Sequence, residues 1–378
     1  MGRAQASAAP MPFLPTAPVR IQPYLGYRNK ERLVISARAL RSRSSEFGKT
    51  AKWRAMGRMA SQFVSHEMAG LDVELEIVSP SGHTSRHRAT SNKEGFIHFD
   101  VALLGVWPYE EHPKWEAVTF HWANGHGEQC VDGHVLAPGS ATSLALISDI
   151  DDTIIETGIT ANFREVLRNW RRVLQEMPEE RILVPGADVF YNALGGNDGL
   201  PKGEGHAGDH LAASRRPFFY VSSSPWNLFS YLVAYMQGRG LPLGPIELRD
   251  WGLNRETFGS ASHGTHKRAA IEGIIATYPE LKFALIGDDS QGDLTAFADI
   301  AVAKPGRIRA VFIRKVGEAM TPEELAAKAT LEAAHIPLWM GEGYDKGHEF
   351  LASMGLLDDG EAETIVKAVG TGELGVVA

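Results

Sequence analysis

The stretch SLALISDIDDTII, residues 143–155, joins a short apolar run to three closely spaced carboxylates, Asp149, Asp151 and Asp152. Its apolar part, LALIS, is typical of a strand that is buried on both faces of a parallel sheet. Carboxylates this close repel one another, and the end of a buried strand gives them little water. We therefore expect a cation to bind at the end of this strand.

Four further apolar runs of the same kind follow, and helical segments lie between them. The runs are PFFYVSS (217–223), GPIELRD (244–250), FALIGDD (283–289) and IRAVFIR (308–314). The helical segments are NFREVLRNWRRVLQEM (162–177), PWNLFSYLVAYMQGRG (225–240) and THKRAAIEGIIATYP (265–279). Alternation of strands and helices is typical of α/β proteins. The sequence thus predicts an α/β fold with a doubly wound, parallel, Rossmann-like sheet.

The chain before this part has a different period. Apolar and polar residues alternate from residue 71 to about residue 146, as in LDVELEIVSPSG (71–82) and EGFIHFDVAL (94–103). This period indicates strands with one buried face, and the short spacing between them predicts a small antiparallel β-sandwich domain.

Four parts are therefore expected along the chain. They are a disordered tail (1–20), a basic segment with the β-sandwich domain (21–140), a catalytic domain (141–315) and a helical C-terminal extension (316–378). The extension contains TPEELAAKATLEAA, in which Thr321, Pro322 and Glu324 have the spacing of a capping box at the start of a helix.

The composition is that of a globular protein, with 44% hydrophobic and 22% charged residues among 378. Cys130 is the single cysteine, so an internal disulfide framework is excluded and a reducing, cytoplasmic location is expected. No run of about 18 apolar residues occurs, so no membrane-spanning helix is expected.

The net charge of −8 is unevenly distributed. Residues 1–60 hold twelve Lys or Arg and two Glu, a net charge of +10, so the remaining residues carry −18. A basic amphipathic helix is expected within residues 50–70. Two interpretations stay open: the basic part binds an anionic membrane as a peripheral contact, or it packs on the acidic remainder of the protein. A nucleic-acid partner is not expected.

Polar residues stand where the predicted parallel strands end, which is where ligands collect in such sheets. Asp149 and Asp151 follow one strand, Ser222 another and Asp288 a third, and Lys267 lies near a helix start. Oxygen ligands without histidine or cysteine favour Mg²⁺, which commonly bridges to a phosphate. Ser222, a helix expected to start at Ser224-Pro225, and Lys267 would stabilise phosphoryl oxygens. The set predicts phosphoryl transfer to an aspartate.

The spacing of these residues resembles that of the haloacid dehalogenase superfamily. The first motif of that superfamily, DxDx(T/V), is matched by Asp149, Asp151 and Thr153, and the second by Ser222. The third is a lysine, for which Lys267 is the candidate and Lys282 and Lys304 are alternatives. The fourth, GDxxxxD, is matched by Asp288 and Asp293. Four motifs in the correct order are a specific signal.

A closer resemblance, over residues 145–315, is to the catalytic domain of the actin-patch-type phosphatidate phosphatases, which are Mg²⁺-dependent and related to the lipins. It rests on DIDDTI, FFYVSSSPWNL, LRDWG, HKRAAIEGIIATYPELKFALIGDDSQGD and IRAVFIR. This sequence reads GDDSQGD where GDSGQKD is more usual, so Asp289 is an additional carboxylate beside Asp288. Of the two, Asp288 is the favoured metal ligand.

The resemblance implies hydrolysis of phosphatidic acid to diacylglycerol and phosphate through an aspartyl-phosphate. In that scheme Asp149 is the nucleophile and Asp151 the general acid and base, and Ser222 and Lys267 complete the catalytic set. Mg²⁺ is bound by Asp149, by Asp151 through its carbonyl and by Asp288, with Asp289 and Asp293 as further candidates. Asp152 is expected to stabilise the turn.

Two other functions stay open. One is a phosphatase of the same superfamily that acts on a soluble phosphomonoester. The other is a non-catalytic module that binds lipid or protein on a phosphatase scaffold. Trp226, Phe229 and Tyr231, beside the predicted site, would suit either a lipid surface or a helix core.

Overall fold

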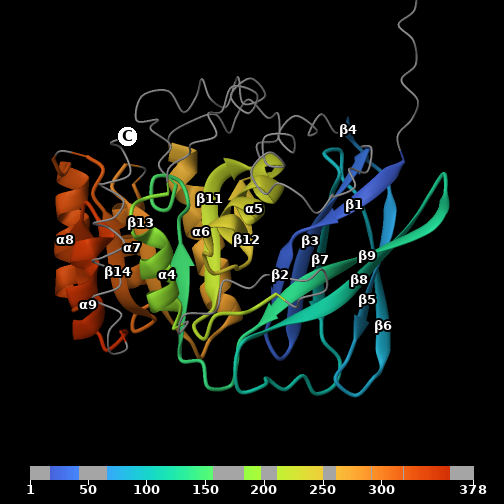
Figure 1. Ribbon diagram of the computed structural model, residues 1–378, viewed down its shortest axis with the longest axis horizontal. Coiled ribbons are helices and arrows are strands. Elements are labelled where there is room, and N and C mark those ends of the chain that lie inside the picture. The colour runs from blue at the N-terminus through green and yellow to red at the C-terminus, as the bar shows by residue number, and fades with distance from the viewer. Residues whose placement is uncertain are drawn as a thin grey trace, which may run out of the picture.

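The structure is a computed structural model that describes residues 18–41, 66–155, 183–196, 211–249, 261–290, 292–317 and 319–357. These residues form two sheets that lie side by side, one N-terminal and one parallel (Figure 1). Three expectations lie mainly or wholly outside the described residues: the disordered tail, the basic helix within 50–70 and the helix at 162–177.

The N-terminal sheet has nine strands in the described residues. They are β1 (Val19–Pro23), β2 (Leu25–Arg28), β3 (Arg32–Arg41), β4 (His66–Glu67), β5 (Asp72–Val78), β6 (Thr84–Thr90), β7 (Phe96–Ala102), β8 (Lys114–Asn124) and β9 (Gly127–Ala137). Their order is β1-β3-β2-β9-β8-β5-β6, and β4 and β7 also pair with β3. β1 begins at Val19, inside the stretch expected to be a tail.

Pairing in this sheet is mixed, whereas the sequence analysis predicted an antiparallel sandwich. Most neighbours are antiparallel, but β2 and β9 pair in parallel, with Gly26 opposite Val135. Alternation of apolar and polar residues tells which face a side chain lies on, but it carries no information about the direction of the neighbouring strand. The direction of β2 was therefore not predictable from the period.

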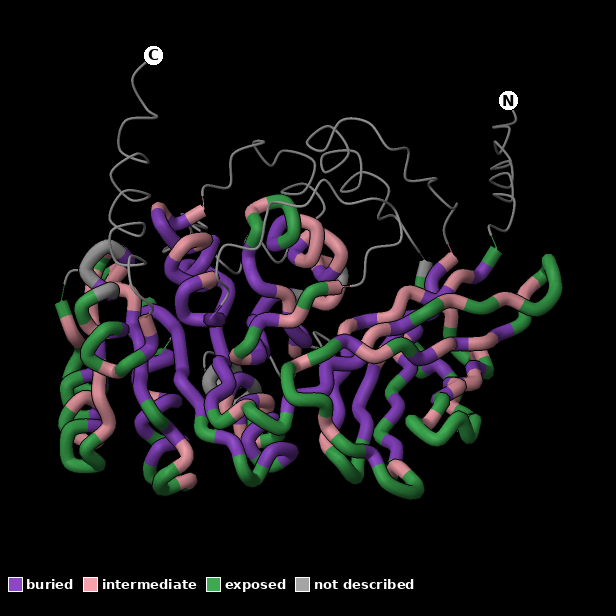
Figure 2. The backbone as a smooth tube through the Cα atoms, turned by 60° about the horizontal axis from the view of Figure 1, so that its bottom comes forward, coloured by how far each residue is buried: buried purple, intermediate pink, exposed green. Residues whose placement is uncertain are grey.

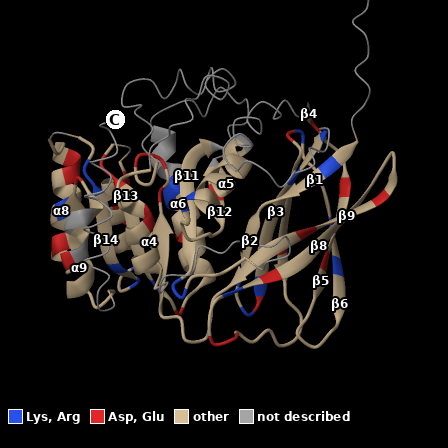
Figure 3. Ribbon diagram, in the orientation of Figure 1, with Lys and Arg blue, Asp and Glu red and all other residues tan. Residues whose placement is uncertain are grey.

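Buried apolar side chains of this sheet form a core cluster of their own. Val73, Leu75 and Ile77 of β5 point into it, as the alternation predicted. The opposite face carries charge: Arg86 of β6 pairs with Glu76 at 2.7 Å, and Arg88 pairs with Glu74 at 2.6 Å. Charges of both signs are visible along these strands in Figure 3. Charge on the outermost strand, β6, disfavours further strand pairing at that edge.

The second sheet is parallel throughout. Its strands are β10 (Leu144–Ser148), β11 (Phe218–Pro225), β12 (Ile246–Arg249), β13 (Lys282–Asp288), β14 (Ile308–Arg314) and β15 (Leu338–Gly341), in the order β12-β11-β10-β13-β14-β15. The first five coincide with the five predicted apolar runs. β15 was missed because it has four residues in a segment expected to be helical.

Helices cover both faces of the parallel sheet. They are α4 (Ala187–Gly195), α5 (Phe229–Arg239), α6 (Ala261–Thr277), α7 (Asp293–Ala303), α8 (Pro322–Ala333) and α9 (His348–Ser353), with the 3₁₀ turns η1 (Trp226–Leu228) and η3 (Tyr344–Gly347). Leu144 and Leu146 pack with α4, α5 and α9, while Ala145 and Ile147 pack with α6, α7 and α8. β10 is accordingly buried along its whole length, and β13 along all of its length after Lys282 (Figure 2). The predicted α/β fold with a parallel sheet is confirmed.

The capping signals in the sequence predicted the start of α8 correctly but not the start of α5. α8 begins as predicted, because the Thr321 hydroxyl accepts from the Glu324 amide and the Glu324 carboxylate accepts from the Thr321 amide. The prediction that a helix starts at Ser224-Pro225 was wrong. β11 continues to Pro225, and α5 begins only after the η1 turn, with Leu228 as its N-cap.

The strand order places the topological switch point of the sheet at the end of β10. If the six strands are numbered by their order along the chain, they lie in the sheet in the order 3-2-1-4-5-6. The chain therefore adds strands on one side of β10 first and on the other side later. Crossovers that diverge in this way leave room at the carboxyl ends of the strands. Asp149 and the carboxylates that follow it lie at this end.

The two sheets pack on each other through named contacts. The ring of Tyr24 stacks on Trp226 at 4.5 Å and meets the edge of Phe229 at 4.4 Å. Farther along, the Tyr278 hydroxyl donates to the Arg28 carbonyl at 3.1 Å. Trp226 and Phe229 are thus packed as core residues of the two-sheet contact. None of the described helices is long and apolar enough to cross a bilayer.

Candidate active site

The turn after β10 presents its side chains from a fixed backbone. The Asp149 amide donates to the Ile286 carbonyl of β13 at 2.8 Å, and the Asp152 amide donates to the Ile155 carbonyl at 2.9 Å. Asp152 has a φ of 56°, a left-handed conformation that aspartate tolerates better than most residues. Asp152 is therefore the turn residue that the sequence analysis expected.

Three carboxylates from distant parts of the chain converge at this turn. Oxygen atoms of Asp149, Asp288 and Asp293 all lie within 4.8 Å of one another, and all three residues are buried. Asp288 ends β13 and Asp293 begins α7. Gly287 permits the approach, because a Cβ atom at that position would overlap the Asp293 carboxylate. The glycine of the GDxxxxD motif thus has a steric reason.

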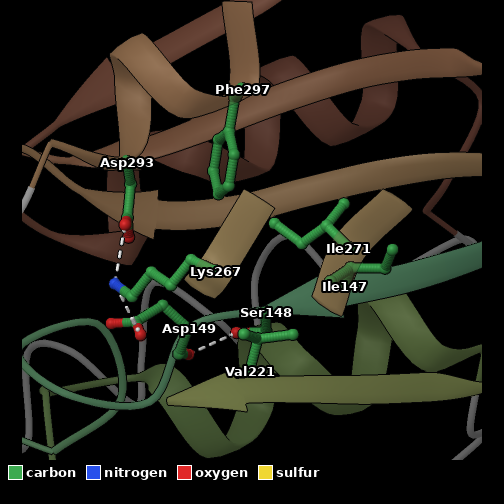
Figure 4. A pocket seen from close by; sticks show the side chains of 8 residues that line it. All are labelled: Ile147, Ser148, Asp149, Val221, Lys267, Ile271, Asp293 and Phe297. Carbon is green, nitrogen blue, oxygen red and sulfur yellow. Dashed lines mark hydrogen bonds and ion pairs between the residues drawn. The ribbon is translucent and has the colours of Figure 1, made fainter. Parts of the chain in front are cut away.

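Lys267 bridges two members of this cluster. Its Nζ lies 2.9 Å from Asp149 Oδ1 and 2.6 Å from Asp293 Oδ1. Figure 4 shows its side chain reaching between the two carboxylates, with apolar side chains that include Ile271 and Phe297 beside it. The other candidate lysines lie elsewhere: Lys282 is exposed at the start of β13, and Lys304 caps the C-terminus of α7.

Burial dominates the electrostatics of the cluster. Burial raises the pKa of Asp149 well above its ordinary value, Lys267 opposes this rise, and the neighbouring carboxylates add to it. Burial and then Asp293 raise the pKa of Asp288 to about 7, against the opposing effect of Lys267. For Lys267 itself, burial lowers the pKa, but the attraction of the three carboxylates outweighs burial and leaves the pKa raised. Lys267 is therefore protonated at neutral pH.

Asp151 faces a different group of residues. Its carboxylate accepts from the Ser222 hydroxyl at 2.6 Å and from the Ser224 hydroxyl at 3.1 and 3.2 Å. The Ser222 oxygen also accepts from the Ser224 amide at 2.9 Å. Ser224 was expected only as a helix cap, so its contact with Asp151 was missed. The one available signal was its place two residues after Ser222 on a strand, which puts both side chains on one face.

The structure separates the two adjacent aspartates of the GDDSQGD segment. Asp288 points into the cluster, where its Oδ2 lies 3.3 Å from the Thr153 hydroxyl and its Oδ1 accepts from the Ser290 amide at 2.5 Å. Asp289 Oδ1 instead accepts from the amides of Val316 and Gly317, at 2.6 and 3.0 Å. Asp288 and Asp293 thus belong to the cluster, whereas the Asp289 carboxylate binds the backbone of the loop after β14.

The donor set fits a hard divalent cation. Asp149, Asp288 and Asp293 offer oxygen ligands only, and the positive charge that reaches them in the described structure is that of Lys267. Oxygen-only sites of this kind suit Mg²⁺. A cation here would also offset the burial and the mutual repulsion that raise the pKa values of Asp149 and Asp288.

Residues 144–315 match the family model described as "Phosphatidate phosphatase APP1, catalytic domain". This match covers β10 to β14 and includes every residue of the carboxylate cluster. The resemblance predicted from the motifs is thus confirmed for this segment.

Two curated relatives extend the comparison. The chain is 31% identical over 182 residues to Phosphatidate phosphatase APP1 of Saccharomyces cerevisiae, an alignment that covers 48% of this chain and 27% of that protein. It is 27% identical over 175 residues to an uncharacterized protein of Schizosaccharomyces pombe, covering 46% of this chain and 25% of the relative. The chain therefore spans about a quarter of the length of these relatives.

Among solved structures, a calcium binding mutant of Bacteroides uniformis beta-glucuronidase 2 aligns over 89% of this chain and 38% of its own chain. The sequence identity is 11% and the TM-score is 0.24. A likeness this slight carries no conclusion about fold or function.

Proposed function

We propose that residues 144–315, which match the catalytic domain of phosphatidate phosphatase APP1, make this chain a phosphoric monoester hydrolase that converts phosphatidic acid to diacylglycerol and phosphate. The observation that carries the proposal is the buried cluster of Asp149, Asp288, Asp293 and Lys267 inside the matched segment. A cluster of this charge and depth is costly for stability, which favours a role in chemistry.

We assign Mg²⁺ as the metal, which the carboxylates of Asp149, Asp288 and Asp293, together with Asp151, would hold. When bound, Mg²⁺ would offset negative charge on the phosphoryl group during transfer. Lys267 has the complementary task of favouring the ionised form of Asp149, because its charge opposes the rise in pKa that burial causes. The Thr153 hydroxyl, 3.4 Å from Asp149 Oδ2 and 3.3 Å from Asp288 Oδ2, orients both groups.

In the first step, a carboxylate oxygen of Asp149 attacks phosphorus and forms an aspartyl-phosphate. The bond from phosphorus to the glycerol oxygen breaks, and the protonated Asp151 carboxyl gives its proton to that oxygen, which leaves as diacylglycerol. Ser222 and Ser224 hold the Asp151 carboxyl in position through their hydroxyls.

In the second step, the Asp151 carboxylate takes a proton from water as the water oxygen attacks phosphorus. The bond from phosphorus to Asp149 breaks, which releases phosphate and restores both aspartates to their starting states. Each bond that forms is matched by one that breaks, and the proton lent by Asp151 is returned by the water.

We further assign the haloacid dehalogenase-type fold to residues 141–315. The 3-2-1-4-5-6 strand order, with the nucleophile at the end of the first and central strand, supports this assignment. Residues 21–140 and 316–378 are then the flanking parts. The basic N-terminal residues are the proposed contact with an anionic membrane, and a cytoplasmic location with peripheral membrane contact fits a lipid substrate.

The test compares phosphate release from phosphatidic acid vesicles and from a panel of soluble phosphomonoesters, with and without Mg²⁺. Wild type should release phosphate from the vesicles only with Mg²⁺, and Asp149→Asn should release none. Asp152→Asn is the matched control, because asparagine accepts the left-handed turn and should retain activity. Hydrolysis of soluble esters alone would favour the soluble-substrate alternative. Equal signals from wild type and Asp149→Asn would contradict any enzymatic function and leave the binding-module alternative.

A further inference from the structure

Two buried tyrosines lie behind the nucleophile loop, defined here as Asp149–Thr153. Tyr191 is in α4 and Tyr344 begins η3, and the exposed fraction of each residue is at most 1%. Neither residue belongs to a sequence motif described above. Tyr344 also lies beyond the segment that matches the APP1 catalytic domain.

Each tyrosine is connected to one end of the loop. At the far end, the Tyr344 hydroxyl donates to the Thr153 carbonyl at 2.7 Å. At the near end, the Ser148 hydroxyl donates to the Asp149 carbonyl at 2.6 Å and lies 2.8 Å from the Tyr191 hydroxyl. Either hydroxyl can be the donor in the contact between Ser148 and Tyr191, and in both cases the bond links Tyr191 to the residue that precedes Asp149.

The rings are fixed by aromatic packing. Tyr344 stacks on Phe190 at 4.5 Å, and Tyr191 stacks on Phe218 at 5.6 Å. The two tyrosines themselves meet edge to face at 6.0 Å. Burial raises the pKa of both phenols, so both hydroxyls stay protonated at neutral pH. The loop thus rests on a rigid support with both of its ends bonded.

We propose that Tyr191 and Tyr344 are positioning residues that hold the backbone of the nucleophile loop, so that Asp149 and Asp151 keep the geometry needed for phosphoryl transfer. The inference rests on the proposed function for its catalytic consequence. Thr153 links the support to the site, since its carbonyl accepts from Tyr344 and its hydroxyl contacts Asp149 and Asp288. A displacement of about 1 Å in a reacting group can lower a rate about 100-fold.

The experiment removes one hydroxyl at a time with Tyr344→Phe and Tyr191→Phe, which leave the rings in place. Tyr278→Phe is the matched control: Tyr278 is also buried and donates to the Arg28 carbonyl, but it precedes the start of β13, at the opposite end of the parallel strands from the nucleophile loop. We expect kcat to fall about tenfold in both test variants, with KM changed less than twofold. The control should keep both constants.

Hydrogen exchange supplies a readout that does not require activity. Peptides covering residues 145–155 should exchange severalfold faster in both test variants than in wild type, and at the wild-type rate in Tyr278→Phe. Unchanged exchange in these peptides would overturn the proposal, whatever the kinetics. A rise in KM at constant kcat would also overturn it. Absence of phosphate release by wild type would refute the proposed function instead, and exchange would still decide whether the tyrosines hold the loop.

Discussion

Asp288→Asn should stabilise the metal-free protein at the same time as it abolishes activity. Burial and the Asp293 charge raise the pKa of Asp288 from its ordinary value of 3.8 to about 7. At about 1.36 kcal/mol per pH unit, this rise corresponds to about 4 kcal/mol of instability once Asp288 is ionised. Asparagine has nearly the same shape, carries no charge and can still accept from the Ser290 amide, which is 2.5 Å away.

The pH dependence has a definite sign. Because the folded-state pKa of Asp288 is the higher one, the unfolded chain loses this proton first as pH rises. The unfolded state therefore binds fewer protons between pH 3.8 and about 7, and the contribution of Asp288 to stability falls across that window. The variant should match wild type near pH 4 and exceed it by about 2 to 4 kcal/mol at pH 8.

Urea unfolding in the presence of a chelator, at pH 4 to 8, measures this difference. Asp289→Asn is the control, since the Asp289 carboxylate is bonded to the Val316 and Gly317 amides outside the cluster, and asparagine can accept both bonds. A variant Asp288→Asn that is less stable than wild type at pH 8 would refute this account. An advantage that does not change with pH would refute it as well.

Two further predictions concern the same cluster. Mg²⁺ at about 100 times its Kd should stabilise wild type by about 2.7 kcal/mol and raise its Tm by about 3 to 4 °C, measured by calorimetry; a Tm that does not respond would contradict the metal assignment. Gly287→Ala should lower kcat about 100-fold in a phosphate-release assay, because the added Cβ displaces the Asp293 carboxylate. Gly273→Ala, in α6 with open space around the added Cβ, should keep wild-type kcat, and equal losses in the two variants would argue against a local effect at Asp293.

The sequence was most informative about the parallel sheet. Strands buried on both faces read as continuous apolar runs, so β10 to β14 could be predicted, together with the polar residues that follow them. Asp149, Asp288 and Lys267 could be found because each stands at a motif position whose residue type follows from the chemistry.

Features without a fixed spacing could not be predicted. Ser224 has the composition of a helix cap, and its contact with Asp151 depends on β11 extending two residues farther than its apolar run. Tyr191 and Tyr344 reach the loop from two separate elements, and a tyrosine in an apolar segment is indistinguishable from any other core residue. The pairing of β2 with β9 depends on strand direction, which a period of two does not encode.

The position of β10 in the sheet has a consequence for synthesis of the protein. β10 is the first strand of its sheet to be made but lies in the middle, and the Asp149 amide is bonded to Ile286, which the ribosome adds 137 residues later. The partner of Thr153, Tyr344, is a further stretch away, 191 residues after Thr153. At about 5 to 20 residues per second, the chain grows for about 10 to 40 s between these two residues. Asp293 is added 144 residues after Asp149, so a nascent chain carries Asp149 for about 7 to 30 s before the carboxylate cluster can form.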